Sequence, residues 1–233
     1  MSGRFSFYDA DMAKNIAVLL CGSGRSDGSE ITEAVSTLIH LSRLGATYSC
    51  FSPDMPQTEV VNHATGKPQP GGTRNMMAES ARISRGAIAP IGKLDAGAFD
   101  GLIVPGGFGV AKNLCDFASK GTECAVLPDA EAVLRAFHTL KKPIGLICIA
   151  PMLAARIFGT RANGPGCRLT LGGPSPAADA AATLGNTAIA KGVTEVMFDD
   201  KNRVYSTPAY MYDNATPHQV FEGIGRMVEL MLK

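Results

Sequence analysis

Pro143-Ile-Gly-Leu-Ile-Cys148-Ile-Ala-Pro151 is an apolar run that ends on a cysteine and is closed by a proline. The pattern predicts a short buried strand that stops at Cys148 and a helix that starts near Pro151. A side chain at such a turn projects out of the sheet, where the N-terminus of the next helix surrounds it with positive potential. That field lowers the pKa of a thiol, and the thiolate is the reactive form. Cys148 is therefore a candidate nucleophile, although most free cysteines are simply small buried hydrophobic residues.

On both sides of this segment, apolar runs alternate with amphipathic stretches, which is typical of a parallel sheet covered by helices. The main predicted strands cover residues 15–21, 46–51 and 101–104 and the run that ends at Cys148, with short strands at 58–62, 193–198 and 203–206. Helices are predicted from about residue 31 to 45, 74 to 84, 129 to 140 and 217 to 232, and after Gly109 and Pro151. We therefore expect an α/β fold.

Length, composition and charge limit the number of domains and the classes of binding partner. The 233 residues fit one domain, residues 15–233, after a flexible N-terminal extension, residues 1–14. Hydrophobic residues make up 45% of the chain and charged residues 18%, which is enough for a large core. The net charge of +1 favours neither a nucleic-acid nor a membrane partner.

Cysteine and histidine usage points to an intracellular protein. The six cysteines contain no C-x-x-C pair and the four histidines stand far apart, so we expect reduced thiols and no metal site. No apolar run reaches the roughly 18 to 20 residues that span a bilayer. The first residues resemble neither a secretory signal nor a cleaved presequence. The expected compartment is the cytoplasm, or the mitochondrial matrix if this is the mature form of a eukaryotic protein.

Two glycine-rich turns follow predicted strands. Gly22-Ser-Gly-Arg-Ser-Asp-Gly28 resembles a dinucleotide-binding fingerprint, but its third glycine is displaced by one position, so a nucleotide cofactor is not expected. Pro105-Gly-Gly-Phe-Gly109 offers consecutive backbone N–H groups that could stabilise an oxyanion beside Cys148. Taken alone, the second turn is better explained as an ordinary strand-to-helix connection that needs positive φ angles.

Together these features resemble the DJ-1/PfpI superfamily, and within it the ES1 or ElbB-like branch of class I glutamine amidotransferase-like proteins. The resemblance runs from about residue 15 to the C-terminus. It is carried by segments 27–33, 51–54, 62–63, 80–86, 104–114, 142–151 and 206–210. It implies a single-domain, flavodoxin-like three-layer sandwich with a mostly parallel central sheet, usually a homodimer. It also implies a reactive cysteine, matched here by Cys148, beside a glutamate from the first helix.

The glutamate has two candidates. Counting back from Gly45 without gaps places Glu33 on the superfamily position, and Glu30, three residues earlier, is the alternative. Either carboxylate could instead complement the helix dipole. On a helical wheel the apolar stripe Ile31, Ala34, Val35 and Leu38 points roughly opposite to Glu33. A helix that faces both the sheet and a dimer partner would remove this conflict.

The chain also departs from the family pattern. Relatives in the ES1 branch carry Ser-Gly-Cys-Gly after the first strand, whereas this chain has Cys21-Gly-Ser23-Gly24, so Cys21 either neighbours Cys148 or lies in the core. Ile149 replaces the histidine that peptidase-like members place after the nucleophile, and His218 lacks the context of a triad histidine. Proteolysis and glutamine hydrolysis are therefore disfavoured. Further pocket candidates are Ser23, Phe108 and Asn113.

A cysteine and a glutamate without histidine suffice for a cofactor-free glyoxalase. Cys148 would add to glyoxal or methylglyoxal, Glu33 would move protons, and the amides of Gly107 and Ile149 would hold the oxyanion, with glycolate or lactate released. A related deglycase would start from the same adduct. The alternative hypothesis is a redox-sensing protein that acts through oxidation of Cys148.

Overall fold

The computed structural model describes residues 13–233. The predicted extension, residues 1–14, falls mostly on residues 1–12, which lie outside the described residues. The strands are β1 (Asn15–Leu19), β2 (Thr47–Ser52), β3 (Val61–Asn62), β4 (Lys67–Pro68), β5 (Ile88–Pro90), β6 (Gly101–Val104), β7 (Ile144–Ile147), β8 (Arg168–Leu169), β9 (Thr187–Ala188), β10 (Met197–Asp199) and β11 (Val204–Thr207). The α-helices are α1 (Ile31–Arg43), α2 (Met76–Ile83), α3 (Phe117–Lys120), α4 (Pro128–Thr139), α5 (Pro151–Phe158), α6 (Pro176–Thr183) and α7 (Pro217–Met231). Short helical turns are η1 (Ile91–Lys93), η2 (Ala96–Ala98), η3 (Val110–Leu114), η4 (Gly121–Glu123), η5 (Thr160–Ala162) and η6 (Ala209–Met211).

The main sheet has seven strands in the order β10-β11-β7-β6-β1-β2-β5. Only β10 runs antiparallel to its neighbour, and every other pairing in this sheet is parallel. Parallel strands bring their carboxyl ends to one edge of the sheet, which is where open α/β sheets hold their ligands. The strand that ends before Cys148, β7, is an interior strand of this sheet, between β11 and β6.

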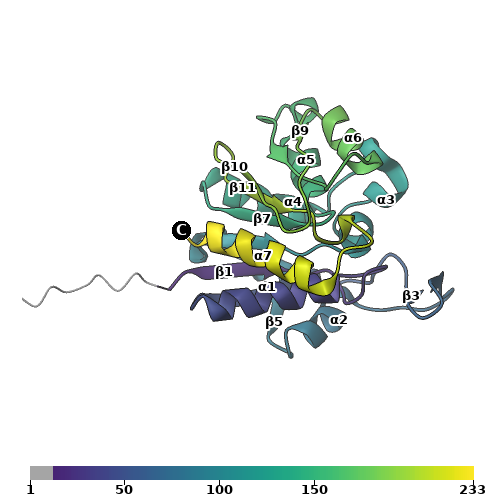
Figure 1. Ribbon diagram of the computed structural model, residues 1–233. Helices are drawn as coiled ribbons and strands as arrows, with labels where there is room; N and C mark the ends of the chain where they lie inside the picture. The colour runs from purple at the N-terminus through teal and green to yellow at the C-terminus, as the bar shows by residue number, and fades with distance from the viewer. Residues whose placement is uncertain (1–12) are drawn as a thin grey trace, which may run out of the picture.

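Helices cover both faces of the sheet, as Figure 1 shows. Alternate residues of β1 point to opposite sides, so Ile16 and Val18 pack with α1 and α7, while Ala17 and Leu19 pack with α4 and α5. The resulting three-layer sandwich is the flavodoxin-like fold that the sequence predicts. Across residues 13–233, no helix has both the length and the apolar character needed to cross a membrane.

Several predicted strands are shorter in the structure. The first ends at Leu19, because the N–H of Cys21 turns away from the ladder to donate to the Ser29 hydroxyl at 3.0 Å. Of the strand predicted over residues 58–62, only β3 forms, and it pairs with β4 over two residues. The prediction over 193–198 moves to β10, because a turn closed by Glu195 N–H and the Gly192 carbonyl occupies the start of that range.

The Asn113 side chain links loops near the carboxyl edge of the main sheet through hydrogen bonds. Its amide nitrogen donates to the carbonyls of Cys21 at 3.1 Å and Asp27 at 2.9 Å, and its oxygen accepts from the N–H of Thr58 at 2.9 Å. The side chain is buried, so these bonds are shielded from water.

We expect Asn113→Ala to lower the free energy of unfolding by about 2 to 4 kcal/mol, because it leaves buried backbone groups without partners. Urea unfolding followed by circular dichroism measures this change. The matched control is Asn214→Ala, at an exposed position, which should change stability by less than about 0.5 kcal/mol. Equal effects of the two substitutions would contradict this role of Asn113.

Candidate functional site

Cys148 lies on the predicted strand-to-helix turn. It follows the last residue of β7, and α5 begins three residues later at Pro151. Its backbone is left-handed, with φ of 60°, and its N–H donates to the carbonyl of Thr207 at 3.0 Å. A non-glycine residue in this region is strained, and such strain is typical of functional turns. The amides of Gly107 and Ile149 lie close enough to the Cys148 side chain to favour its thiolate, which acts to lower the pKa of the thiol.

Glu33 is the carboxylate that contacts Cys148. It lies in the first turn of α1, is fully buried, and is close enough to the Cys148 side chain for each group to shift the pKa of the other. Its Oε2 accepts from the N–H of Gly106 at 2.8 Å, and its Oε1 accepts from the N–H of Tyr210 at 3.3 Å. The carboxylate is therefore held in one orientation by two backbone donors from different loops.

The structure explains why the helical wheel placed Glu33 opposite the apolar stripe of its helix. Ile31 and Val35, half of the expected apolar stripe, are 49% and 38% exposed, whereas Ala34 and Leu38 are buried in the core. The inner face of α1 is thus rotated toward Glu33. Within one chain, Glu33 reaches the site without help from a partner.

Burial governs the protonation of this pair. Loss of water, and then the charge of Glu30, raise the pKa of Glu33 to about 8, although its hydrogen bonds oppose the shift. Burial and the charge of Glu33 also hold the pKa of the Cys148 thiol well above its usual range, despite the amides of Gly107 and Ile149. The expected lowering of the thiol pKa by the helix N-terminus is therefore wrong, because desolvation is the larger effect. Activation of the thiol must come from a base, and Glu33 is the base in contact.

Glycines allow this close approach. A Cβ on Gly106 would lie 2.5 Å from the Cys148 Cβ and 2.7 Å from Glu33 Oε2, so no other residue fits between them. Gly107 has φ of 99°, and a Cβ there would lie 2.4 Å from the Gly28 carbonyl. The two glycine-rich turns are thus packed directly against each other, and the N–H of Gly109 donates to Gly28 at 3.0 Å.

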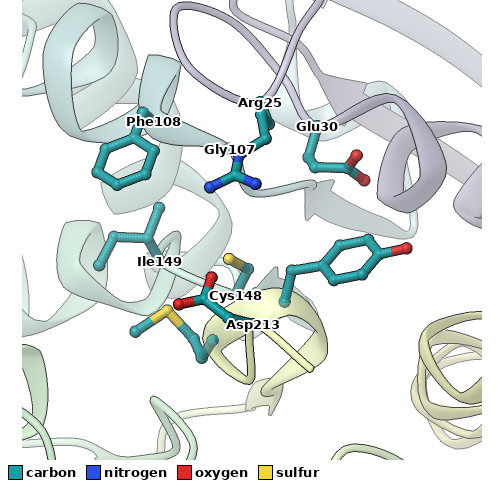
Figure 2. A pocket seen from close by; sticks show the side chains of 9 residues that line it. Arg25, Glu30, Gly107, Phe108, Cys148, Ile149 and Asp213 are labelled. Carbon is teal, nitrogen blue, oxygen red and sulfur yellow. The ribbon is translucent and has the colours of Figure 1, made fainter. Parts of the chain in front are cut away.

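A pocket of about 470 Å³ opens above Cys148. Figure 2 shows Cys148 between the wall that carries Gly107 and Phe108 and the loop that carries Asp213. Its lining residues are Arg25, Glu30, Gly107, Phe108, Cys148, Ile149, Tyr210, Met211 and Asp213. Apart from Glu33, which lies behind the cysteine, the predicted catalytic and oxyanion residues all line this pocket.

Three predicted pocket residues lie elsewhere. Cys21 is fully buried in the core beside Ser29, and burial raises the pKa of its thiol to about 12. Ser23 forms a bridge with Ser29, and Asn113 joins the loops below the site. Glu30 lines the pocket, but its carboxylate caps α1 by accepting from the N–H of Glu33 at 2.8 Å. This capping contact matches the dipole-complementing role considered for it.

Sequence reasoning missed Arg25 and the loop residues Met211 and Asp213. Tyr210 closes a segment that carries the family resemblance, yet its backbone contact with Glu33 had no local signal. One signal was available, since these residues follow the ends of β1 and β11, whose carboxyl ends share the edge at which β7 stops. Among the described residues, no cluster of three or more His, Cys, Asp or Glu side chains could hold a metal ion.

The raised pKa of Glu33 predicts a pH-dependent cost of folding. Between the ordinary carboxyl value of 4.5 and about 8, unfolded Glu33 loses its proton while folded Glu33 keeps it, so stability falls as pH rises through this window. We expect the free energy of unfolding of the parent, relative to Glu33→Gln, to decrease by a few kcal/mol from pH 5 to pH 8. Urea titrations across this range measure the difference. The control is Glu222→Gln, at an exposed position of α7; an equal pH-dependent difference there would refute the assignment.

Comparisons with known proteins identify the family. No family model matches the chain. It is 46% identical over 221 residues to the ES1 protein homolog, mitochondrial, of Rattus norvegicus, covering 94% of this chain and 83% of the relative. It is 45% identical over 224 residues to the Homo sapiens glutamine amidotransferase-like class 1 domain-containing protein 3, mitochondrial, covering 95% and 83%.

Solved structures show the same relationship. A crystal structure of an isoprenoid biosynthesis protein with amidotransferase-like domain from Ehrlichia chaffeensis has a TM-score of 0.86 at 35% identity, covering 94% of this chain and 98% of that one. Drosophila melanogaster DJ-1beta shares the fold alone, with a TM-score of 0.55 at 16% identity over 95% and 91% of the two chains. On the strength of these relatives and the elbow cysteine on a DJ-1-like sheet, the chain belongs to the ES1 family of glutamine amidotransferase-like proteins.

Proposed function

We propose that the protein is a cofactor-independent glyoxalase that converts 2-oxoaldehydes to 2-hydroxy acids. The observation that carries this proposal is the buried pairing of Cys148 with Glu33, which flank Gly106 at the base of an open pocket. A thiol and a carboxyl group with a raised pKa supply a nucleophile and a proton carrier. The reaction needs no redox cofactor, because one substrate carbon is oxidised while its neighbour is reduced.

The first step forms a hemithioacetal. Glu33 takes the thiol proton as the Cys148 sulfur bonds to the aldehyde carbon, and the carbonyl oxygen becomes an alkoxide. The amides of Gly107 and Ile149, which point at the sulfur, lie where they can stabilise the developing negative charge. Glu33 then returns its proton to the alkoxide. This sequence needs no free thiolate in the resting protein, which suits the raised pKa of Cys148.

The second step moves hydrogen between the two substrate carbons. Glu33 removes the proton from the former aldehyde carbon and delivers it to the neighbouring carbonyl oxygen, which gives an enediol. Glu33 then takes the hydroxyl proton of the sulfur-bearing carbon, whose oxygen becomes the thioester carbonyl, and delivers it to the neighbouring carbon. The product is a thioester of Cys148 that carries a hydroxyl group. Water cleaves the thioester, releases the hydroxy acid and restores the thiol.

Pocket size bears on the substrate. A space of about 470 Å³ is typical of sites that hold molecules much larger than glyoxal. Substituted 2-oxoaldehydes, or the glycation adducts of a deglycase, would therefore fit as well. Arg25 and Asp213 provide opposite charges on the lining.

Compartment and assembly are further parts of the proposal. The rat and human relatives carry the word mitochondrial in their names, which supports the matrix rather than the cytoplasm for this chain. The homodimer implied by the family resemblance stays a prediction.

We expect the purified protein to form glycolate from glyoxal without added cofactor, and both Cys148→Ser and Glu33→Gln to reduce turnover to the buffer rate, because each removes an essential group. Chromatography of the product measures the rate. Glu30→Gln should retain turnover, since a glutamine oxygen can still cap α1. The matched thiol control is Cys50→Ala, in β2. A parent protein without turnover, but with rapid peroxide oxidation of Cys148, would replace this proposal with the redox-sensor hypothesis.

The proposed base also predicts a pH profile. Because Glu33 must be unprotonated to accept the thiol proton, kcat/KM should rise by about tenfold per pH unit below its pKa of about 8 and level off above it. Initial rates with methylglyoxal between pH 6 and pH 9 test this. A flat profile over that range would show that Glu33 is not the base.

A further inference from the structure

Cys115 and Cys124 form a second thiol pair, separate from the pocket. Cys115 directly follows η3 and donates from its Sγ to the carbonyl of Val110 at 3.2 Å, and Cys124 directly follows η4. Eight residues lie between the two cysteines, yet each side chain is close enough to shift the pKa of the other. Neither residue lines the Cys148 pocket. The proposed glyoxalase chemistry uses neither thiol.

A short antiparallel pairing brings the two cysteines together. Cys115 pairs with Val126, and this bridge is flanked by bonds from Leu127 N–H to the Leu114 carbonyl at 2.8 Å and from Asp116 N–H to the Ala125 carbonyl at 3.2 Å. Side chains alternate along an extended chain, so Cys124, two residues before Val126, lies on the same face as Cys115. The two cysteine side chains are therefore diagonal neighbours on one face of this antiparallel pairing.

The two thiols differ in acidity. The hydrogen bond from Cys115, and then the charge of Arg156, lower the pKa of Cys124 to about 7, although burial opposes this. The same contact and burial raise the pKa of Cys115. Arg156 is held in place by its Nε, which donates to the carbonyl of Cys124 at 2.6 Å. One member can thus react as a thiolate while the other stays protonated beside it, which is how a nucleophilic and a resolving thiol divide their roles.

We propose that Cys115 and Cys124 form a reversible intramolecular disulfide when a hydroperoxide oxidises the protein. The Cys124 thiolate attacks the peroxide oxygen, the O–O bond breaks, and with protonation a sulfenic acid and one molecule of water or alcohol result. The Cys115 sulfur then attacks the sulfenic sulfur, the S–O bond breaks, and water leaves with the Cys115 proton. Two thiols are oxidised by two electrons, and the peroxide is reduced by two.

The intervening segment can adjust to the new bond. It contains only α3 and η4, each about one turn long, and Gly121 with φ of 53°. Gly121 and Thr122 are partly exposed and Glu123 is exposed, so the segment between the two buried cysteines faces solvent. Cys115 also ends the helix that follows the Gly107–Gly109 turn, so the disulfide would lie one short helix away from the pocket wall.

The test is oxidation of the reduced, folded protein with hydrogen peroxide, followed by alkylation of the remaining thiols, trypsin digestion and mass spectrometry. Lys120 lies between the two cysteines, so the disulfide appears as two tryptic peptides, residues 113–120 and 121–135, joined until a reductant is added. We expect this pair to be the major disulfide. It should form equally in Cys148→Ser and Cys50→Ala, and disappear in Cys115→Ser and Cys124→Ser.

Three outcomes would overturn the proposal. These are oxidation of Cys148 with both thiols left free, a major disulfide that joins either cysteine to a different partner, and loss of the joined peptides in Cys148→Ser. Unfolded protein treated in the same way provides the reference, because it should give a mixture of pairings rather than one. None of these results depends on aldehyde turnover, so the disulfide and the glyoxalase proposal succeed or fail separately.

Discussion

Glu33 and Cys148 are buried side by side, out of reach of bulk water, and much of the surrounding structure serves to hold these two groups together. The thiol comes from the end of β7 and the carboxylate from the first turn of α1, two elements far apart in the sequence. Gly106 separates them and has no side chain to push them apart. Backbone donors from Gly106 and Tyr210 then fix the carboxylate, so the contact depends on three loops at one edge of the sheet.

This contact sets the chemistry of the site. A cysteine at a helix N-terminus is usually expected to be a thiolate, but here burial outweighs the helix field, and the proton stays within the pair. The reactive form is therefore the one in which Glu33 is unprotonated and takes the thiol proton as the new bond forms, rather than one with a free thiolate. The absence of histidine from the pocket lining fits this arrangement, since Glu33 can both accept and return the proton.

Much of the fold could be predicted from the sequence, because strand and helix periodicities are local. The elbow at Cys148 and the strand Gly101–Val104 were located correctly from apolar runs bounded by proline and glycine. The assignment of Glu33 needed family resemblance, since its own helix pattern pointed the other way. That conflict arose because Ile31 and Val35 are largely exposed, and exposure of apolar residues cannot be read from one helix alone.

Other features depend on distant contacts and had no sequence signal. Cys21 could be placed either in the core or beside Cys148, and only the turn of its N–H toward Ser29 shows that it lies in the core. The sequence also predicted a lowered pKa for the Cys148 thiol, whereas burial raises it. The effect of a helix N-terminus can be inferred from local sequence, but the loss of water around a side chain depends on the packed structure. Arg25 and Asp213 become neighbours of Cys148 only when the strand ends meet.

The central claim is that Glu33 keeps its proton far above the ordinary range of a carboxyl group because it is fully buried and lies near the charge of Glu30. Infrared difference spectroscopy on folded protein with isotopically labelled glutamate can follow its protonated carbonyl band as pH rises. The account predicts a band that persists at neutral pH, disappears through about pH 8 and is missing from Glu33→Gln. Loss of every protonated glutamate band by about pH 5, as for exposed carboxyl groups, would contradict it.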